Sequence, residues 1–266
     1  MSCYLRLLLI GYDPIERYYR VRDLVTKRSS NTEYRLYYRF RGDRWYGGIA
    51  TGDVIGCILS CVFCWSWRFR DNYRIGSFYS PQEAFEKIYS IVSARGFDKV
   101  RLSGGEPTIS IDHVIELAKL FEEKGIYFIL ETNGVLIGYF RDYAKRLAQL
   151  SNMIVRVSFK GVSEEEFERL TGADKKFFEY QFKAIENLIN EGLVPGRDVY
   201  AAAMIGFSRD EDISVFVKRL EKIDPRLRDV DWEYVFLYPH VEKRLRELGL
   251  KPLRAVKPNQ IPREMI

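Results

Sequence analysis

From residue 48 onward, short apolar runs typical of strands alternate with longer amphipathic runs typical of helices. The six predicted strands are 49–56, 99–103, 127–131, 153–159, 199–205 and 232–237. A helical segment separates each strand from the next, and strands joined by a helical crossover lie parallel in one sheet. Six such units are two short of a closed eight-fold barrel. We therefore predict an α/β fold, an open partial barrel whose ligands bind at the carboxyl ends of its strands.

The residues at the ends of the helical segments support this division. Ser80 is a typical N-cap, Pro81 suits the first helical position, and Glu83 can reach back to complete a capping box. That helix is predicted to run to Gly96. The other predicted helices are 111–124, 139–150, 164–170, 178–191 and 211–223.

Two segments flank the predicted barrel of residues 48–240. We predict that residues 1–47 form a basic, aromatic cap, and that 241–266 form a C-terminal helix and an extended tail packing on the barrel. Within the cap, residues 31–41 alternate with a period of two, which predicts a strand. Its inward side chains are predicted to be Tyr34, Leu36, Tyr38 and Phe40, and its outward ones Arg35, Arg39 and Arg41. The basic face is either solvated or a docking surface for an anionic partner.

Composition and charge exclude several classes of protein. Apolar residues make up 47% and charged residues 30%, which argues against a disordered chain and against a membrane protein. The apolar run 7–10 is too short for a signal peptide or a membrane span, so we expect a soluble, cytoplasmic protein with no membrane partner. The net charge of +5 arises within residues 1–50, which hold ten Lys and Arg against five Asp and Glu. By charge balance alone, contact with nucleic acid is suggested for that segment and not for the rest of the chain.

Three of the four cysteines lie within eight residues, at Cys57, Cys61 and Cys64. Such crowding in a chain expected to be cytoplasmic suits metal or cluster ligation better than disulfides. A four-iron cluster normally takes four thiolates, so three would leave one iron open to an external ligand. The alternative is a structural zinc site, whose fourth ligand is Cys3, His113 or His240.

The segment Cys57-Ile-Leu-Ser-Cys61-Val-Phe63-Cys64 resembles the three-cysteine signature of the radical S-adenosylmethionine (SAM) superfamily. The resemblance implies a partial (β/α)6 TIM-like barrel and a 4Fe-4S cluster held by the three cysteines, with Phe63 at the adenine of SAM. It also implies an oxidoreductase that takes one electron from a donor such as ferredoxin or flavodoxin. That electron cleaves SAM at the cluster into methionine and a 5′-deoxyadenosyl radical, which abstracts hydrogen from a substrate.

The segments after the later strands extend the resemblance. Gly104 and Gly105 permit close backbone approach to a ligand, and Glu106 can accept a hydrogen bond from an ammonium group. In the family this segment binds the amino group of SAM. Segments after the third, fourth and sixth strands resemble those of the glycyl-radical-enzyme (pyruvate formate-lyase) activases, where a lysine pairs with the carboxylate of SAM and a histidine lies by the adenosine. The SAM-site residues implied there are Thr132, Asn133, Ser158, Lys160 and His240, and Glu131 is expected to turn toward a cation or substrate.

The resemblance leaves the substrate open. The first hypothesis is an activase-like enzyme whose protein substrate completes the open mouth of the barrel. The alternative is an enzyme that modifies RNA or a nucleobase, because basic and aromatic residues interleave in 35–44 and 65–70. A hypothesis of another class is a non-catalytic zinc-binding module on the same scaffold.

Overall fold

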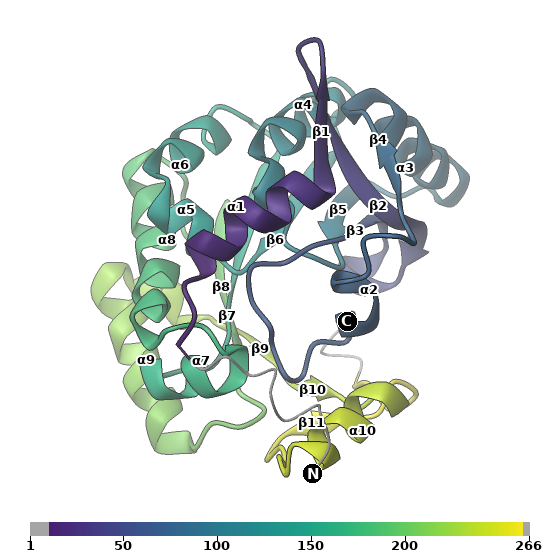
Figure 1. The fold of residues 1–266 in the computed structure, drawn as a ribbon. Coiled ribbons are helices and arrows are strands. Elements are labelled where there is room, and N and C mark those ends of the chain that lie inside the picture. Colours follow the sequence, from purple (N-terminus) through teal and green to yellow (C-terminus); the bar gives the residue numbers. More distant parts are fainter. Residues whose placement is uncertain (1–10, 263–266) are drawn as a thin grey trace.

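A computed structural model describes residues 11–262, which fold around one curved, mostly parallel nine-stranded sheet with helices outside it (Figure 1). In this described part, six strands run parallel in the order β3-β5-β6-β7-β8-β9. Their bounds are β3 Ile49–Val54, β5 Lys99–Ser103, β6 Tyr127–Thr132, β7 Met153–Phe159, β8 Val199–Met204 and β9 Asp231–Glu233. The spatial order of these strands follows the chain order, which confirms the predicted open partial barrel.

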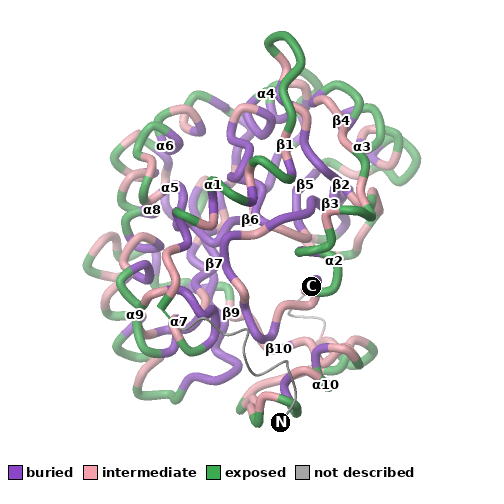
Figure 2. The backbone as a smooth tube through the Cα atoms, in the orientation of Figure 1, coloured by how far each residue is buried: buried purple, intermediate pink, exposed green. Residues whose placement is uncertain are grey.

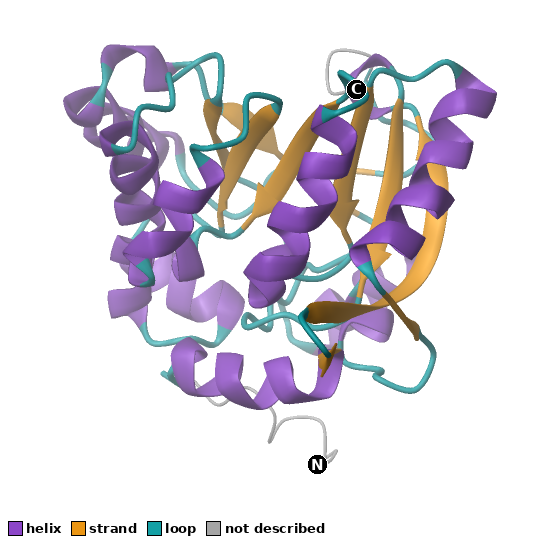
Figure 3. Ribbon diagram, turned by 90° about the horizontal axis from the view of Figure 1, so that it is seen from above, coloured by secondary structure: helices purple, strands orange, loops and turns teal. Residues whose placement is uncertain are grey.

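Helices cover the outside of the sheet (Figure 3). They are α3 Pro81–Arg95, α4 Ile111–Glu122, α5 Val135–Tyr139, α6 Arg141–Leu147, α7 Glu164–Thr171, α8 Phe178–Asn190 and α9 Asp210–Ile223. The layer between strands and helices is apolar and fully buried (Figure 2). For example, Phe128 of β6 lies 6.3 Å, between ring centroids, from Phe121 of α4. This burial of apolar area supplies most of the driving force for the fold.

Local sequence accounts for several helix boundaries, and one short helix was not predicted. Ser80 and Glu83 form the predicted capping box at the start of α3. The helix predicted over 139–150 corresponds to α6, which is shorter than predicted, and the short helix α5, which was not predicted, precedes it and meets it at Phe140. Within α5, an added Cβ on Gly138 would stand 1.9 Å from the carbonyl oxygen of Tyr180 in α8. Only glycine lets the backbone of α5 approach α8 so closely.

The N-terminal segment continues the sheet through antiparallel strands. It comprises α1 Pro14–Val25, β1 Thr26–Ser29 and β2 Thr32–Asp43, and β2 pairs with β1, with β3 and with β4 Ser77–Tyr79. The strand predicted over 31–41 is confirmed, and of its predicted outward side chains Arg39 is exposed, whereas the prediction is wrong for Arg35. Arg35 is only 1% exposed and donates to the carbonyl oxygen of Val25 at 3.2 Å, because α1 covers that face. A register shift between Tyr37 and Arg39 breaks the alternation, and Arg39 and Arg41 turn toward Asp53.

The C-terminal segment departs from the prediction at 232–237. That stretch is divided between β9, in the main sheet, and β10 Val235–Phe236, which pairs in parallel with β11 Ala255–Val256. The helix α10 Pro239–Glu247 connects β10 to β11. Within residues 11–262, no helix is both long and apolar enough to cross a membrane. Cys3 lies outside the described residues.

Candidate active site

A cavity of about 630 Å³ opens at the carboxyl ends of the parallel strands. Within the described residues it gathers the three predicted cluster ligands and eight of the nine predicted SAM-site residues. These lining residues are Cys57, Cys61, Cys64, Phe63, Gly104, Gly105, Glu106, Thr132, Asn133, Ser158 and Lys160. The chain therefore brings together side chains that are about one hundred residues apart in sequence.

The cysteine loop follows β3 and is held by backbone hydrogen bonds to the end of α7. Ser60 N–H donates to Thr171 O at 3.1 Å, and Val62 N–H donates to Leu170 O at 2.9 Å. The Leu59 N–H lies 3.4 Å from the Cys57 sulfur, which is a suitable donor to a bound thiolate. The loop is thus fixed against the end of α7.

Burial favours the protonated thiols of Cys57 and Cys61. It raises the pKa of Cys57 to about 12 and that of Cys61 to about 11. A bound metal centre replaces such protons, since thiolates are its ligands. Three thiols around one cavity are the donor set expected for a cluster with one open iron.

The histidine offered as a zinc ligand in the alternative hypothesis is engaged elsewhere. His113 is fully buried, with Nε2 2.7 Å from the Tyr37 hydroxyl and Nδ1 3.0 Å from Glu33 O. Burial lowers its pKa to about 3. Among the residues described, no three His, Cys, Asp or Glu side chains are arranged to hold a single metal ion.

The Gly-Gly-Glu segment lies directly against the start of the cysteine loop. Glu106 N–H donates to Gly56 O at 2.8 Å, and a Cβ on Gly105 would stand 2.2 Å from that same oxygen. The Glu106 carboxylate accepts from the Thr132 hydroxyl at 2.7 Å and from Asn133 N–H at 2.8 Å. These bonds tie the end of β5 to the end of β6.

Asn133 brings an unused donor into the cavity. It is 4% exposed, and its side-chain oxygen accepts from Val135 N–H at 3.0 Å. Its side-chain nitrogen is buried with no hydrogen-bond partner among the described residues. An unpaired buried donor on a cavity wall fits the binding of a polar ligand such as SAM.

Lys160 and Ser158, at the end of β7, share one acidic partner. Lys160 Nζ contacts the Ser158 hydroxyl and lies 3.5 Å from Glu233 Oε2, while that hydroxyl donates to Glu233 Oε1 at 2.6 Å. Burial acts to lower the pKa of Lys160, but the Glu233 carboxylate outweighs it and the pKa is raised. Burial acts to raise the pKa of Glu233, but Lys160 and Arg156 overcome it and hold the pKa at about 2. Both groups are therefore charged at neutral pH.

His240 is the predicted SAM-site residue that the structure places apart from the others. It is not among the side chains lining the cavity, and its Nε2 lies 2.7 Å from Trp65 O. Trp65 directly follows the last cysteine. His240 therefore links α10 to the cysteine loop.

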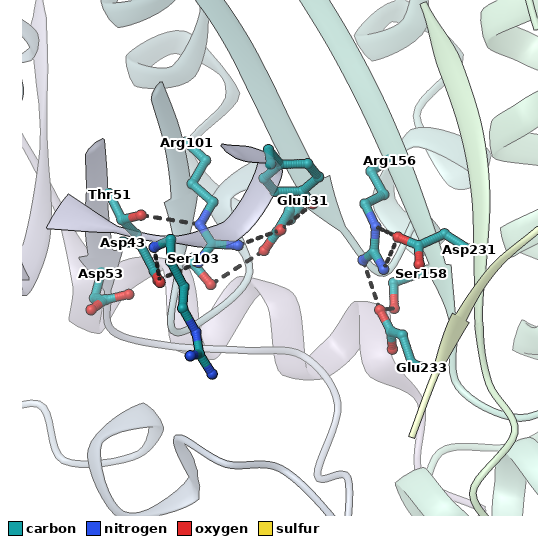
Figure 4. Close-up of polar contacts among 12 residues, drawn as sticks. Asp43, Thr51, Asp53, Arg101, Ser103, Glu131, Arg156, Ser158, Asp231 and Glu233 are labelled. Carbon is teal, nitrogen blue, oxygen red and sulfur yellow. Dashed lines mark hydrogen bonds and ion pairs between the residues drawn. The ribbon is translucent and has the colours of Figure 1, made fainter. Parts of the chain in front are cut away.

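The sequence analysis missed a charged layer deeper in the barrel (Figure 4). Arg101 of β5 pairs with Glu131 at 2.7 Å and with Asp43 at 2.8 Å, which confirms that Glu131 turns toward a cation. Arg156 of β7 pairs with Glu233 at 2.7 Å and also with Asp231. The sequence does contain a feature that could have revealed this layer. An arginine lies inside each of two strands, two residues before Ser103 in one and two residues before Ser158 in the other.

Comparison with known proteins covers more than half of the chain. Residues 54–220 match the family described as the Radical SAM superfamily. A probable GTP 3′,8-cyclase of Saccharolobus islandicus is 29% identical over 141 residues, which are 52% of this chain and 42% of that protein. A GTP 3′,8-cyclase of Thermodesulfovibrio yellowstonii is 28% identical over 177 residues, 66% of this chain and 53% of that protein. The Fe-coproporphyrin III synthase of Methanosarcina barkeri is 32% identical over 142 residues, 53% and 33% respectively.

The chain thus spans between one third and about half of the length of these curated relatives. They are cyclases and a synthase, not the glycyl-radical-enzyme activases that the strand-end motifs resemble. Among solved structures, the maturase HydG from Carboxydothermus hydrogenoformans has a TM-score of 0.54 at 15% identity, over 74% of this chain and 49% of that one. TYW1 with a lysine-pyruvate adduct bound has a TM-score of 0.50 at 19% identity, over 79% and 77%.

These structural likenesses agree with the partial-barrel fold. Members of the matched family use a 4Fe-4S cluster and SAM, and Cys57, Cys61 and Cys64 fit the family's cysteine motif. The chain belongs to the radical SAM superfamily.

Proposed function

We propose that this chain is a radical SAM enzyme and that its cavity holds both cofactors. The observation that carries the proposal is the gathering of three thiols, the Gly-Gly-Glu segment, Asn133 and Lys160 around one space. When bound, the cluster and SAM supply a 5′-deoxyadenosyl radical that takes a hydrogen atom from the substrate, with one electron delivered by a ferredoxin or flavodoxin. The protein binds, orients and shields these groups.

Each lining residue has a defined task in this proposal. Cys57, Cys61 and Cys64 hold the cluster, and Phe63 packs against the adenine. Gly104 and Gly105 let the backbone approach SAM, and the Glu106 carboxylate, fixed by Thr132 and Asn133, faces its amino group. The free side-chain N–H of Asn133 donates to SAM. Lys160, oriented by Ser158, pairs with the carboxylate of SAM in place of part of its contact with Glu233.

His240 acts differently in this proposal from its predicted role beside the adenosine. It holds the Trp65 carbonyl and so positions the cysteine loop. It is a positioning residue, since it acts through the loop.

The test is anaerobic reconstitution with iron and sulfide, followed by electron paramagnetic resonance of the reduced protein with and without SAM. We expect a four-iron signal that changes on adding SAM, and 5′-deoxyadenosine after reduction. Cys61→Ser is expected to abolish both, while the matched control Cys3→Ser retains both. A protein that takes up only zinc, or loss of both signals in Cys3→Ser, would contradict the assignment.

We further propose that the substrate is a nucleotide-like small molecule, as in the nucleobase alternative. Two of the relatives described above are named for a reaction of GTP. Arginine and aromatic side chains meet in the cavity, where the guanidinium groups of Arg39 and Arg41 each lie 5.9 Å from the Trp65 ring. Arginines suit phosphates, and flat rings suit stacked bases.

The charged layer supports a substrate position below SAM. Arg101 and Arg156 lie two residues before Ser103 and Ser158 on their strands, which is about 7 Å deeper into the barrel at the usual rise of a strand. The same cavity reaches both levels. A substrate resting on the Arg101–Glu131 pair would therefore lie one layer from the ligand bound at the strand ends.

Titration of the reconstituted enzyme with GTP and other nucleoside triphosphates, read by tryptophan fluorescence, tests the substrate class. We expect Arg41→Gln to weaken binding about tenfold, the effect of one charge-assisted hydrogen bond. In that variant Asp53 keeps its contact with Arg39, and Asp43 keeps its contact with Arg101. Arg20→Gln, on the exposed side of α1, is the matched control. Nucleotides that neither bind nor stimulate 5′-deoxyadenosine formation would return the activase hypothesis to first place.

A further inference from the structure

The short helix α2, Trp67–Arg70, places its last side chain beside the cysteine loop. Gly56 N–H, just before Cys57, donates to Arg70 O at 2.8 Å, and Arg70 N–H donates to Ser66 O at 2.8 Å. The chain thus folds back so that Arg70 joins both ends of the loop. Its side chain is 4% exposed and lines the same cavity as the three thiols.

The Arg70 guanidinium has one donor group left over. Its Nε donates to Asp71 Oδ2 at 3.1 Å, and its Nη2 contacts the same oxygen at 2.5 Å. Its Nη1 is buried with no partner among the residues described. Leaving an N–H of a buried cation unpaired costs more free energy than leaving a neutral N–H unpaired, so this donor group suits an anionic or polar acceptor in the cavity.

Positive charge exceeds negative charge around this helix. Asp71 also pairs with Arg17 at 3.1 Å, so in the described structure two guanidinium groups share one carboxylate. A third, that of Arg244, lies 5.0 Å from the ring of Trp67 on the same helix. The excess charge favours an anion on the cavity side of α2.

We propose that Arg70 is a positioning residue for the iron–sulfur cluster: its Nη1 donates to a sulfur of the cluster, and its charge makes the cluster easier to reduce. This inference rests on the proposed function. A four-iron cluster on three thiolates is anionic and gains a further negative charge when it accepts an electron. Hydrogen bonds to the sulfurs and nearby positive charge therefore raise its reduction potential.

The test is a redox titration of the cluster, without SAM, in wild type, Arg70→Gln, Arg70→Lys and Arg68→Gln. Arg68 is the matched control, because it lies on the same helix and is exposed. For Arg70→Gln we expect an iron content near that of wild type. At a fixed reductant potential, we expect the ratio of reduced to oxidised cluster to be roughly tenfold lower. This ratio corresponds to a reduction potential about 59 mV lower for one electron. Arg70→Lys keeps the charge and is expected to show a smaller fall. Arg68→Gln is expected to show none.

Equal potentials in Arg70→Gln and Arg68→Gln would overturn the inference and leave Arg70 as a structural partner of Asp71. An unchanged reduction potential together with weaker SAM binding in Arg70→Gln would overturn the inference too. It would indicate that Nη1 binds the carboxylate of SAM instead. If Arg70→Gln takes up no iron, Arg70→Lys decides, since its potential must still lie below that of wild type. Failure of the proposed function itself is distinct, because wild type would then show no four-iron signal at all.

Discussion

Replacing Glu106 by glutamine tests how the site is held before any cofactor binds. One carboxylate oxygen accepts from the Thr108 N–H, the Thr108 hydroxyl and the Thr132 hydroxyl, and the other accepts from Asn133 N–H. A glutamine can keep its oxygen toward the first three donors. Its side-chain NH2 group then faces the Asn133 N–H. Two hydrogen-bond donors lie against each other in the buried site, and the Asn133 N–H loses its acceptor.

The cost follows from these contacts. Leaving the Asn133 N–H unpaired costs about 1–3 kcal/mol. The remaining bonds lose the ionised acceptor, which makes such bonds roughly twice as strong as neutral ones. We therefore expect Glu106→Gln to lower the free energy of unfolding by about 3 kcal/mol.

Urea denaturation of the cofactor-free protein measures this loss. Thr132→Val, at nearly constant shape, removes the donor to Glu106 and also the acceptor of the Gly134 N–H, and is expected to cost about 2 kcal/mol. The double variant is expected to lose less than the sum, because Thr132 and Glu106 share one bond. An unfolding midpoint for Glu106→Gln equal to that of wild type would refute the reasoning, and so would strict additivity in the double variant.

Three further predictions concern single side chains around the site. Burial lowers the pKa of His113 to about 3 from 6.5, so between these two pH values only the unfolded chain binds a proton at this histidine. The free energy of unfolding therefore falls as the pH falls, by about 2 kcal/mol at pH 5. His113→Asn is expected to flatten this dependence in urea titrations at several pH values. Gly105→Ala places a Cβ 2.2 Å from the carbonyl oxygen before Cys57, so we expect loss of iron uptake, whereas Gly96→Ala, with open space around it, retains iron. His240→Phe removes the bond to Trp65 O and is expected to speed iron loss to a chelator, with SAM affinity of the loaded enzyme unchanged.

Most of the parallel strands were predictable because buried strands leave short runs rich in apolar residues, which end where a polar loop begins. Four of the six predicted strands match the observed ones to within one residue at each end, such as 153–159 for β7. The capping box at Ser80 was predictable for a different reason, since its two hydrogen bonds depend only on residues three apart. The three cysteines were found because their ligand spacing is local.

The features that were missed depend on partners far away in sequence. Arg35 in an alternating strand reads as a solvent-facing residue, and only the arrival of α1 over that face buries it. The division of 232–237 depends on β11, which returns from about twenty residues later to pair with β10. His240 was predicted to lie by the adenosine, whereas the position of α10 directs it to a backbone carbonyl.

The paired charges in the barrel explain how a polar cavity can keep its shape. Arg101 is a buried cation between carboxylates from two strands, Asp43 of β2 and Glu131 of β6, whereas Arg156, whose side chain is 12% exposed, meets two carboxylates of β9, Asp231 and Glu233. Removing one member of such a set leaves an uncompensated buried charge, at a cost of about 3–5 kcal/mol, so each side chain holds its neighbour in place. The Tyr46 hydroxyl adds a donor to Glu131 at 2.6 Å, which fixes the loop between β2 and β3 across the cavity. A substrate that meets this layer meets donors and acceptors already oriented, and preorganisation of this kind is what the protein contributes to reactions whose chemistry belongs to the cofactor.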